Sequence, residues 1–209
     1  MLKGEQLAFR YGADKPWILH QIDIEIAPGE AVGLSGPSGQ GKTTLAKVLA
    51  GYIKPTAGHV TVARQPLPIR GYCPVQLIFQ HPELAVNPRW RIDQILHEGF
   101  SPPIALLDAL SIDSNWLTRW PHELSGGELQ RLAVARALGP GTHYLIADEM
   151  TAMLDANTQA QIWQVVLAHA RQHHLGLLVI SHEAPLIKRL CDRVINLPFP
   201  TAPSILPTG

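Results

Sequence analysis

Residues 36–44 read GPSGQGKTT, and this stretch decides the fold. It fits the pattern GxxxxGK[ST], in which glycines let the backbone curl until several N–H groups point at one oxyanion. An apolar strand pattern at 31–35 precedes it, and apolar residues at helical spacing follow it at 45–52. An ordinary glycine turn before a helix is the alternative, but this setting favours a phosphate site. Lys42 is then expected to reach the β- and γ-phosphates, and Thr43 to bind magnesium.

Composition narrows the class of protein. The 209 residues are 46% hydrophobic, which suits one globular domain with room for a small subdomain. Seventeen Lys and Arg balance seventeen Asp and Glu, so the basic excess typical of a nucleic-acid binder is missing. Two cysteines without a CxxC pattern indicate a reducing compartment. Because no apolar run could span a bilayer, we expect a chain that is soluble alone and needs a partner for any membrane role.

Apolar strand patterns alternate with amphipathic helix patterns along much of the chain. This alternation predicts an α/β fold with a mostly parallel central sheet. Prolines interrupt short helical patterns from about 85 to 121, which predicts a small helical subdomain. The tail from Pro198 is rich in proline, and we expect it to be loosely ordered.

Two acids, Asp148 and Glu149, follow the apolar strand pattern at 144–147. Ligands bind where parallel strands end, so Asp148 could hold magnesium and Glu149 could deprotonate an attacking water. A solvated turn or a helix cap is the alternative for this pair. His182 likewise follows the strand pattern at 175–180, where it could contact a γ-phosphate, although a lone histidine is more often structural.

A second glycine turn, LSGGELQR, lies at 124–131. Ser125 can cap a helix that begins there, so this turn resembles a second anion site of the same physical kind.

The order of motifs GPSGQGKTT, FQ, LSGGE, YLIADE, LDA and SH resembles the ATPase subunit of an ABC transporter, from about residue 2 to about residue 197. LSGG is the diagnostic motif, because other P-loop families lack it. The resemblance implies a P-loop NTPase fold with an N-terminal antiparallel β subdomain. It also implies a single ABC ATPase domain, with a core lobe at 1–84 and 139–197 and a helical subdomain at 85–138 that carries the LSGGE motif.

The resemblance also implies a role for each matching residue toward ATP and Mg²⁺. Tyr11 would stack on adenine, although the residues alone allow an ordinary half-buried tyrosine equally well. Asp148 would be the magnesium-linked acid and Glu149 the general base, while His182 would contact the γ-phosphate. The phosphate loop would consist of Gly36, Pro37, Ser38, Gly39, Gln40, Gly41, Lys42, Thr43 and Thr44.

Further roles concern a second ATPase subunit. Gln80 would touch magnesium and water and sense the membrane subunit. Asp155 would lie in the loop that crosses to the other ATPase. The turn that faces the γ-phosphate of the opposite subunit would consist of Ser125, Gly126, Gly127 and Glu128.

Two motifs depart from the family pattern. Glu128 stands where glutamine is usual, which is a mild change. The motif EMTAMLD at 149–155 resembles EPTSALD, with Met150 for proline, Ala152 for serine and Met153 for alanine. The serine hydroxyl is therefore absent from the crossing loop, which puts its contacts to a second subunit in doubt.

Residues 79–96 resemble a branch of importers for dipeptides, oligopeptides and nickel or other metal chelates. Asn87, Pro88 and Arg89 match that branch, whereas His81 replaces its aspartate. We therefore expect an ATP-hydrolysing subunit of an importer at the cytoplasmic face of the inner membrane. Its expected partners are a second ATPase chain, integral membrane permease subunits and, indirectly, a solute-binding protein, but no nucleic acid.

Other functions stay possible at this point. A soluble ABC-type ATPase of DNA repair or translation is the main alternative, although such proteins usually carry a coiled coil or two ATPase units. A small-molecule kinase would not explain the LSGGE motif. A regulator that binds nucleotide without turnover would not need both Glu149 and His182. An exporter is the weaker interpretation, because exporter ATPases are commonly fused to membrane spans. Finally, His169 and His173 at i,i+4, next to His174, could bind a metal, but histidines that complement a helix dipole are the more common case.

Overall fold

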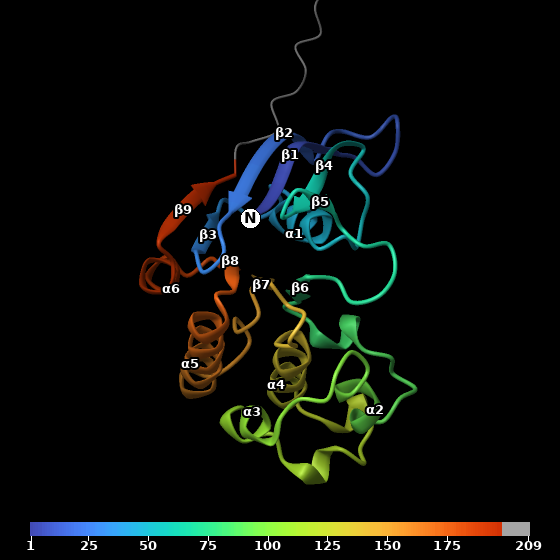
Figure 1. Ribbon diagram of the computed structural model, residues 1–209, viewed down its shortest axis with the longest axis vertical. Helices are drawn as coiled ribbons and strands as arrows, with labels where there is room; N and C mark the ends of the chain where they lie inside the picture. Colours follow the sequence, from blue (N-terminus) through green and yellow to red (C-terminus); the bar gives the residue numbers. More distant parts are fainter. Residues whose placement is uncertain (198–209) are drawn as a thin grey trace, which may run out of the picture.

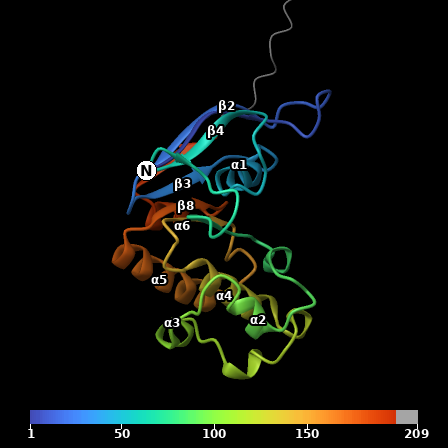
Figure 2. The same cartoon turned by 45° about the vertical axis from the view of Figure 1, so that its right-hand side comes forward.

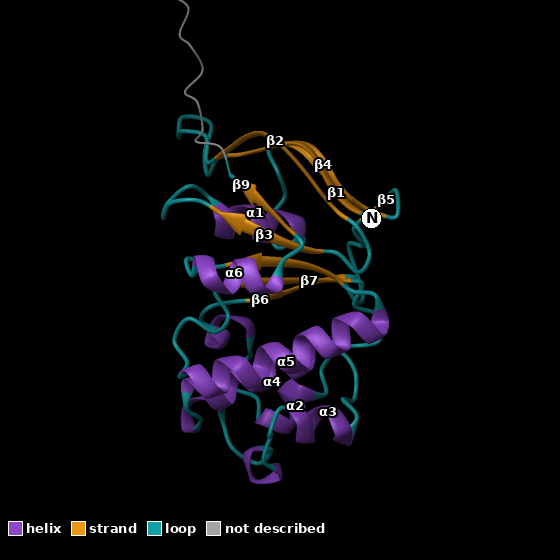
Figure 3. Ribbon diagram, turned by 90° about the vertical axis from the view of Figure 1, so that its left-hand side faces the viewer, coloured by secondary structure: helices purple, strands orange, loops and turns teal. Residues whose placement is uncertain are grey.

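A computed structural model describes residues 1–197, which form two stacked sheets with a layer of helices beneath them (Figure 1). The proline-rich tail predicted from Pro198 lies outside the described residues. Seen from the side, helix α1 lies between the two sheets, and α4 and α5 cover the far face of the second sheet (Figure 3).

The N-terminal sheet is antiparallel and has the strand order β2-β1-β4-β5. The central strand β1 pairs with β2 on one side and β4 on the other, with Leu2 opposite both Ile26 and Val62. This arrangement confirms the antiparallel β region that the family resemblance implied. Its strands are β1 (Leu2–Phe9), β2 (Leu19–Ile26), β4 (Ala57–Val62) and β5 (Gln65–Pro66).

The second sheet has the order β6-β7-β8-β3-β9, and all four neighbouring pairs among the described residues are parallel. Three of its strands are buried along most of their length, as expected for a parallel sheet covered on both faces. The predicted α/β fold with a mostly parallel sheet is confirmed. The strands are β3 (Ala31–Ser35), β6 (Val75–Ile78), β7 (Tyr144–Asp148), β8 (Gly176–Ile180) and β9 (Arg193–Asn196).

Alternation of side chains along the parallel strands divides the core into two clusters. In β8, Leu177 and Val179 face one cluster, which is shared with α4 and α5. Leu178 and Ile180 face the other, which is shared with α1 and the antiparallel sheet. A period of two along a strand thus lets one sheet bury apolar side chains on both faces.

Four helices cover the parallel sheet, namely α1 (Lys42–Leu49), α4 (Gly126–Ala137), α5 (Ala156–His173) and α6 (Ala184–Leu190). Helix α1 ends at Leu49, and Gly51, near which the sequence pattern predicts the helix to stop, has a φ of 76° just beyond it. Tyr52 is therefore outside the helix and 57% exposed, with its ring edge-on to Phe79 at 5.2 Å between centroids.

Short helices fill the segment between β6 and α4, and they lie at the end of the molecule opposite the antiparallel sheet (Figures 1 and 2). This agrees with the proline-broken helical patterns, whereas the division into lobes at 84/85 and 138/139 stays a prediction. None of the helices within residues 1–197 has the length and hydropathy needed to cross a bilayer. The short helices are η1 (Pro82–Ala85), α2 (Ile92–Leu96), α3 (Ile104–Ala109), η2 (Ser114–Trp116) and η3 (Pro121–Glu123).

Candidate functional site

The register of the parallel sheet brings four strand ends to one edge. Ile180 of β8 lies opposite both Leu34 of β3 and Asp148 of β7, and Ala147 lies opposite Ile78 of β6. The segments that follow β3, β6, β7 and β8 therefore start at the same level of the sheet. Ligands of open α/β sheets bind at this carboxyl edge.

The loop after β3 is closed by its own lysine. The Lys42 side chain is 6% exposed, and its Nζ donates hydrogen bonds to the carbonyl oxygens of Gly36, at 2.6 Å, and Pro37, at 2.9 Å. Both carbonyls belong to the turn that wraps around the start of α1. Residues 36–41 thus surround an ammonium group at the positive end of a helix, which is an electrostatic setting for phosphate.

Gly41 is required where the loop becomes helix. Its φ is 89°, and a Cβ there would lie 2.8 Å from Ile18 Cγ2 and 3.0 Å from the Ile18 carbonyl oxygen. A side chain would therefore be strained and would collide with the β1–β2 connection. The neighbouring Gln40 is buried, and its Oε1 has no hydrogen-bond partner among the described residues.

Asp148 supplies a buried carboxylate beside this loop. Its side chain is 4% exposed, and burial raises its pKa, while a hydrogen bond from the Thr43 hydroxyl lowers it and the Glu149 charge raises it. Carboxylate and hydroxyl oxygens are hard donors of the kind that Mg²⁺ prefers. Because the acid is desolvated and Lys42 and Lys47 provide only part of a balancing charge, Thr43 and Asp148 fit a divalent cation.

Glu149 and His182 contact each other. Their Oε1 and Nε2 atoms are 2.7 Å apart, with side-chain exposures of 19% for Glu149 and 48% for His182. Glu149 has a φ of 51°, and its N–H donates to the Ile180 carbonyl at 2.9 Å. This left-handed turn at the end of β7 aims the carboxylate toward the end of β8. His182 follows β8, which pairs directly with β3, the strand before the 36–44 loop.

Gln80 follows β6 on the other side of β7. It lies two residues after Ile78, the last residue of β6, and it is half-buried. Because Ile78 is opposite Ala147, Gln80 leaves the sheet beside the segment that carries Glu149.

The second glycine turn forms the start of α4. Ser125 is the N-cap, and its Oγ accepts from the Glu128 N–H at 3.2 Å. In return, Glu128 Oε2 accepts from the Ser125 N–H at 2.6 Å. The two residues thus form a capping box, which fixes the start of α4 at Gly126 with Ser125 as its cap.

A hollow of about 440 Å³ lies next to this turn. Its lining includes Ser125, Glu128, Met153 and Asp155, but no residue of the 36–44 loop. The LSGGE turn and the 149–155 loop therefore flank one hollow, and residues 36–44 do not line it.

Asp155 caps α5 at the end of the crossing loop. Its carboxylate accepts from the backbone N–H groups of Asn157 and Thr158, both at 3.0 Å, and hydrogen bonding to Thr158 is the main cause of its lowered pKa. Met150, which replaces the family's proline, is 3% exposed in the core beneath the loop, whereas Met153 is 68% exposed.

Tyr11 lies in the connection between β1 and β2 and is 69% exposed. Its ring stands edge-on to Phe9, with centroids 5.0 Å apart. The same connection touches Gly41 through Ile18, so Tyr11 lies on a segment that contacts the phosphate loop.

Sequence reasoning missed three polar residues that hold the site. Thr151 is 3% exposed, and its Oγ1 accepts from Trp163 Nε1 at 3.1 Å and from Gln159 Nε2 at 3.0 Å. Gln130 and Arg136 of α4 donate to backbone carbonyls on either side of Gln80. A polar residue between Leu129 and Leu132 on the apolar side of α4 was the available signal for Gln130.

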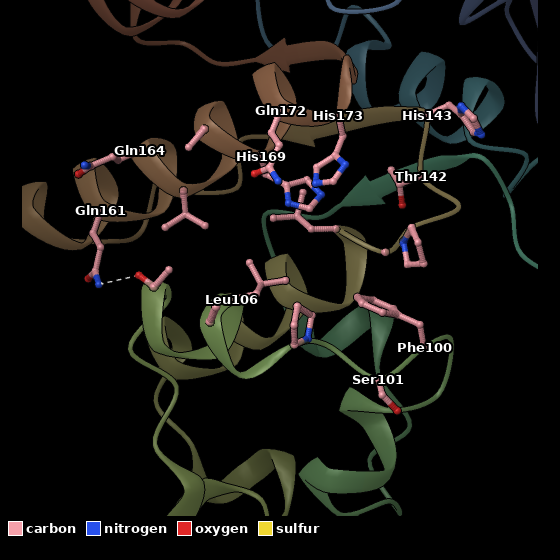
Figure 4. Close-up of a pocket in the computed structure, with 18 residues that line it drawn as sticks. Phe100, Ser101, Leu106, Thr142, His143, Gln161, Gln164, His169, Gln172 and His173 are labelled. Atoms are coloured by element: carbon pink, nitrogen blue, oxygen red, sulfur yellow. Dashed lines mark hydrogen bonds between the residues drawn. The ribbon is translucent and has the colours of Figure 1, made fainter.

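A hollow of about 950 Å³ lies elsewhere, between α3, α5 and the segment before β7 (Figure 4). His169 and His173 line it, with ring centroids 4.3 Å apart. Burial, followed by the charge of His173, lowers the pKa of His169 to about 4. No group of three or more potential metal ligands occurs within residues 1–197, so the suggested metal site there gains no support.

Comparison with known proteins agrees with the motifs. The ABC transporter family model matches residues 19–152. A peptide import ATP-binding protein of Brucella ovis is 36% identical over 202 residues, which cover 86% of this chain and 63% of that protein. The nickel import ATP-binding protein NikE of Rhodospirillum rubrum is 34% identical over 86% of this chain and 72% of that protein. The chain thus spans less than two thirds of the length of the Brucella relative.

A solved structure shares the fold. A dimeric ATP-binding cassette in a post-hydrolysis state with ADP and Pi superposes with a TM-score of 0.79, 22% identity and 97% coverage of both chains. Together with the family model and the relatives, the motif order leads to one conclusion: the chain belongs to the ABC transporter family.

Proposed function

We propose that this chain is the ATP-binding and ATP-hydrolysing subunit of an importer for peptides or for nickel and other metal chelates. The 2.7 Å contact between Glu149 and His182 carries the ATPase part of the proposal, because it pairs a carboxylate with an imidazole where β7 and β8 end. The relatives named for peptide import and nickel import support this class of cargo.

The residues of the carboxyl edge take separate roles in this proposal. The N–H groups of residues 36–44 and the Lys42 ammonium group would bind the β- and γ-phosphates. Thr43, Asp148 and Gln80 would hold Mg²⁺, which neutralises phosphate charge when bound. Tyr11, exposed on the neighbouring connection, would stack on adenine.

Proton transfer would fall to Glu149. A carboxylate accepts the proton of an attacking water, and its ring partner His182 holds it in position through the 2.7 Å contact. The His182 side chain is about half-exposed, so its ring would have room to turn toward a bound γ-phosphate.

The assembly follows from the separation of the two glycine turns. Residues 36–44 do not line the hollow beside the LSGGE turn. One chain would therefore supply half of each of two nucleotide sites. Ser125, Gly126, Gly127 and Glu128, with Asp155 beside them, would face the nucleotide of a second ATPase subunit. Permease subunits would dock near Gln80, which places the chain at the cytoplasmic face of the inner membrane, and a solute-binding protein would deliver cargo from the other side.

Replacing the base tests the reaction. Glu149→Gln is expected to keep ATP binding and lose hydrolysis by about 10²–10⁴-fold, the usual contribution of a general base. Phosphate release and binding of a fluorescent ATP analogue measure the two steps. Glu183→Gln is the matched control, since Glu183 bonds Gln159 on the same edge and is expected to leave hydrolysis unchanged. Equal hydrolysis by Glu149→Gln and the unmodified chain would show that the base lies elsewhere.

Purification tests the assembly and the import role. The tagged chain is extracted with its membrane complex, and its companions are identified by mass spectrometry. Permease subunits, a second ATPase and a solute-binding protein are the expected companions. Ribosomes or DNA in their place would overturn the importer in favour of a non-transport ABC ATPase.

A further inference from the structure

Two side chains of helix α4 form hydrogen bonds to the first and the last residue of the segment 79–85. Gln130 Nε2 donates to the carbonyl oxygen of Phe79 at 3.2 Å, and Arg136 Nη1 donates to that of Ala85 at 3.1 Å. Gln80 lies between these two carbonyls. Both bonds use backbone acceptors and leave the Gln80 side chain out.

The first hydrogen bond is buried. Gln130 is 2% exposed and Phe79 is 8% exposed, so neither the amide nor the carbonyl can exchange its partner for bulk water. The Phe79 ring is held in addition by Tyr52 at 5.2 Å and by Lys47, whose Nζ lies 5.9 Å from the ring centroid. If the buried Phe79 carbonyl lost this side-chain donor, it would be left unsatisfied at a cost in free energy, so the bond resists breaking.

The second hydrogen bond has a charged donor. The Arg136 guanidinium also pairs with Glu98, just after α2, and its side chain is 22% exposed. Arg136 of α4 therefore contacts both Ala85 of η1 and Glu98, two residues after the end of α2. A charge-assisted bond of this kind is stronger and more directional than a neutral one.

The two hydrogen bonds are separated by the same number of residues on the helix and on the segment. Phe79 and Ala85 are six residues apart, as are Gln130 and Arg136, which lie about 9 Å apart along the helix axis. Helix and segment thus run side by side in the same direction. Ser125 caps the same helix five residues before Gln130, so one helix links the segment 79–85 to the LSGGE turn.

We propose that Gln130 and Arg136 are positioning residues that make the Gln80 segment and the LSGGE turn move as one body. The proposal rests on the proposed function, in which Gln80 responds to this chain's own nucleotide and Ser125 acts on that of the second subunit. Loading of one site then sets the position of the turn that completes the other site. Neither residue touches nucleotide or reacting atoms.

Hydrogen exchange of the purified full chain tests this linkage at a concentration where light scattering shows a monomer. In the unmodified chain, saturating MgATP is expected to slow exchange in 36–44, in 79–85 and at the start of α4. In the double variant Gln130→Met/Arg136→Met, the change is expected to persist in 36–44 and 79–85 and to be lost from the start of α4. Arg136→Lys on its own, which keeps a donor for the Ala85 carbonyl, is expected to retain the response.

Arg91→Met is the matched control, because Arg91 also donates to a carbonyl, that of Thr118 at 2.7 Å, without contacting α4 or the segment 79–85. The single variants Gln130→Met and Arg136→Met are each expected to lose about half of the response, so the inference is testable even where the double variant does not fold. An α4 response that persists in the variants, or that is missing from the unmodified chain, overturns the inference. Absence of any MgATP effect in 36–44 would instead refute the proposed function.

Discussion

Asp148 carries a negative charge that the fold only partly compensates. Burial desolvates this carboxyl group and raises its pKa, while a hydrogen bond from the Thr43 hydroxyl lowers it. Functional residues commonly destabilise the fold in this way, because the missing charge is supplied by what binds.

Asp148→Asn is therefore expected to stabilise the chain while weakening magnesium-dependent nucleotide binding. Asparagine keeps the shape and an acceptor for Thr43 but carries no charge, so removing the desolvation cost is expected to raise the free energy of unfolding by about 1 kcal/mol. Thermal unfolding without nucleotide and ATP titrations with and without Mg²⁺ measure the two effects. A variant that is less stable than the unmodified chain would contradict this account of the buried charge.

His169 gives the fold a dependence on pH. Its pKa falls from 6.5 to about 4 on folding, so between these values the unfolded chain binds a proton that the folded chain excludes. Stability is therefore present above about pH 6.5 and is lost as the pH falls toward 4. No carboxylate lines the surrounding hollow within residues 1–197, and His173 and His143 are the other titratable groups there.

His169→Gln is expected to reduce this loss of stability. After allowance for the partial exposure of the ring, the effect between pH 7 and pH 4.5 is about 1–2 kcal/mol. Urea unfolding at a series of pH values measures it, and His122→Gln, at an exposed position of η3, is the control. Parallel pH curves for His169→Gln and the unmodified chain would refute the assignment.

The sequence allowed us to predict which site residues follow the ends of the strands, but not which of their side chains contact one another. Lys42, Asp148 and His182 each follow an apolar strand pattern, and the sheet register carries them to one edge. The 2.7 Å contact between Glu149 and His182 depends on a left-handed backbone turn at Glu149 that no sequence pattern specifies. The roles of these residues toward ATP remain predictions.

At the scale of elements, the start of α4 depends on a reciprocal cap. The pattern SGGE predicted a helix start, and the structure adds that Glu128 closes the box by accepting the Ser125 N–H. Glutamine, the usual residue at this position of the family, also offers an oxygen to that N–H. The departure at Glu128 therefore leaves the geometry of the turn intact.

Glu128→Ala and Glu128→Gln separate the contribution of the cap from that of the charge. Alanine removes the acceptor and is expected to lower the free energy of unfolding by about 1 kcal/mol. Glutamine keeps the acceptor and loses only the favourable interaction with the helix dipole, worth about 0.3–1 kcal/mol. Urea unfolding of both variants measures the difference, and equal costs would show that charge alone stabilises this helix start.

The end of α1 was predictable from Gly51, whereas the packing of Tyr52 was not. Apolar spacing puts Tyr52 in line with Leu45 and Val48 of the helix. The left-handed φ of 76° at Gly51 lies between the helix and Tyr52, and Tyr52 packs edge-on against Phe79, which follows β6. A partner distant in sequence is invisible to periodicity within one helix.

At the scale of the molecule, the separation of the two glycine turns predicts nucleotide-dependent association. Glu149→Gln with MgATP is expected to shift from monomer to dimer, because bound ATP that is not hydrolysed stays available to both turns. Adding Ser125→Arg is expected to keep the chain monomeric without weakening its own ATP binding, since Ser125 lines a hollow that residues 36–44 do not line. Light scattering measures the mass, and a dimer that forms equally well with Ser125→Arg would place the contact elsewhere.

The hydrogen bonds of Lys42 within its own loop affect the free energy of phosphate binding. Its ammonium group already serves as an internal ligand of the loop through the carbonyls of Gly36 and Pro37. An arriving phosphate competes with these carbonyls, so binding exchanges hydrogen bonds rather than adding them, and the loop needs little further ordering. The favourable change then comes mainly from bringing unlike charges together, which makes affinity at this loop sensitive to ionic strength and comparatively insensitive to the number of new contacts.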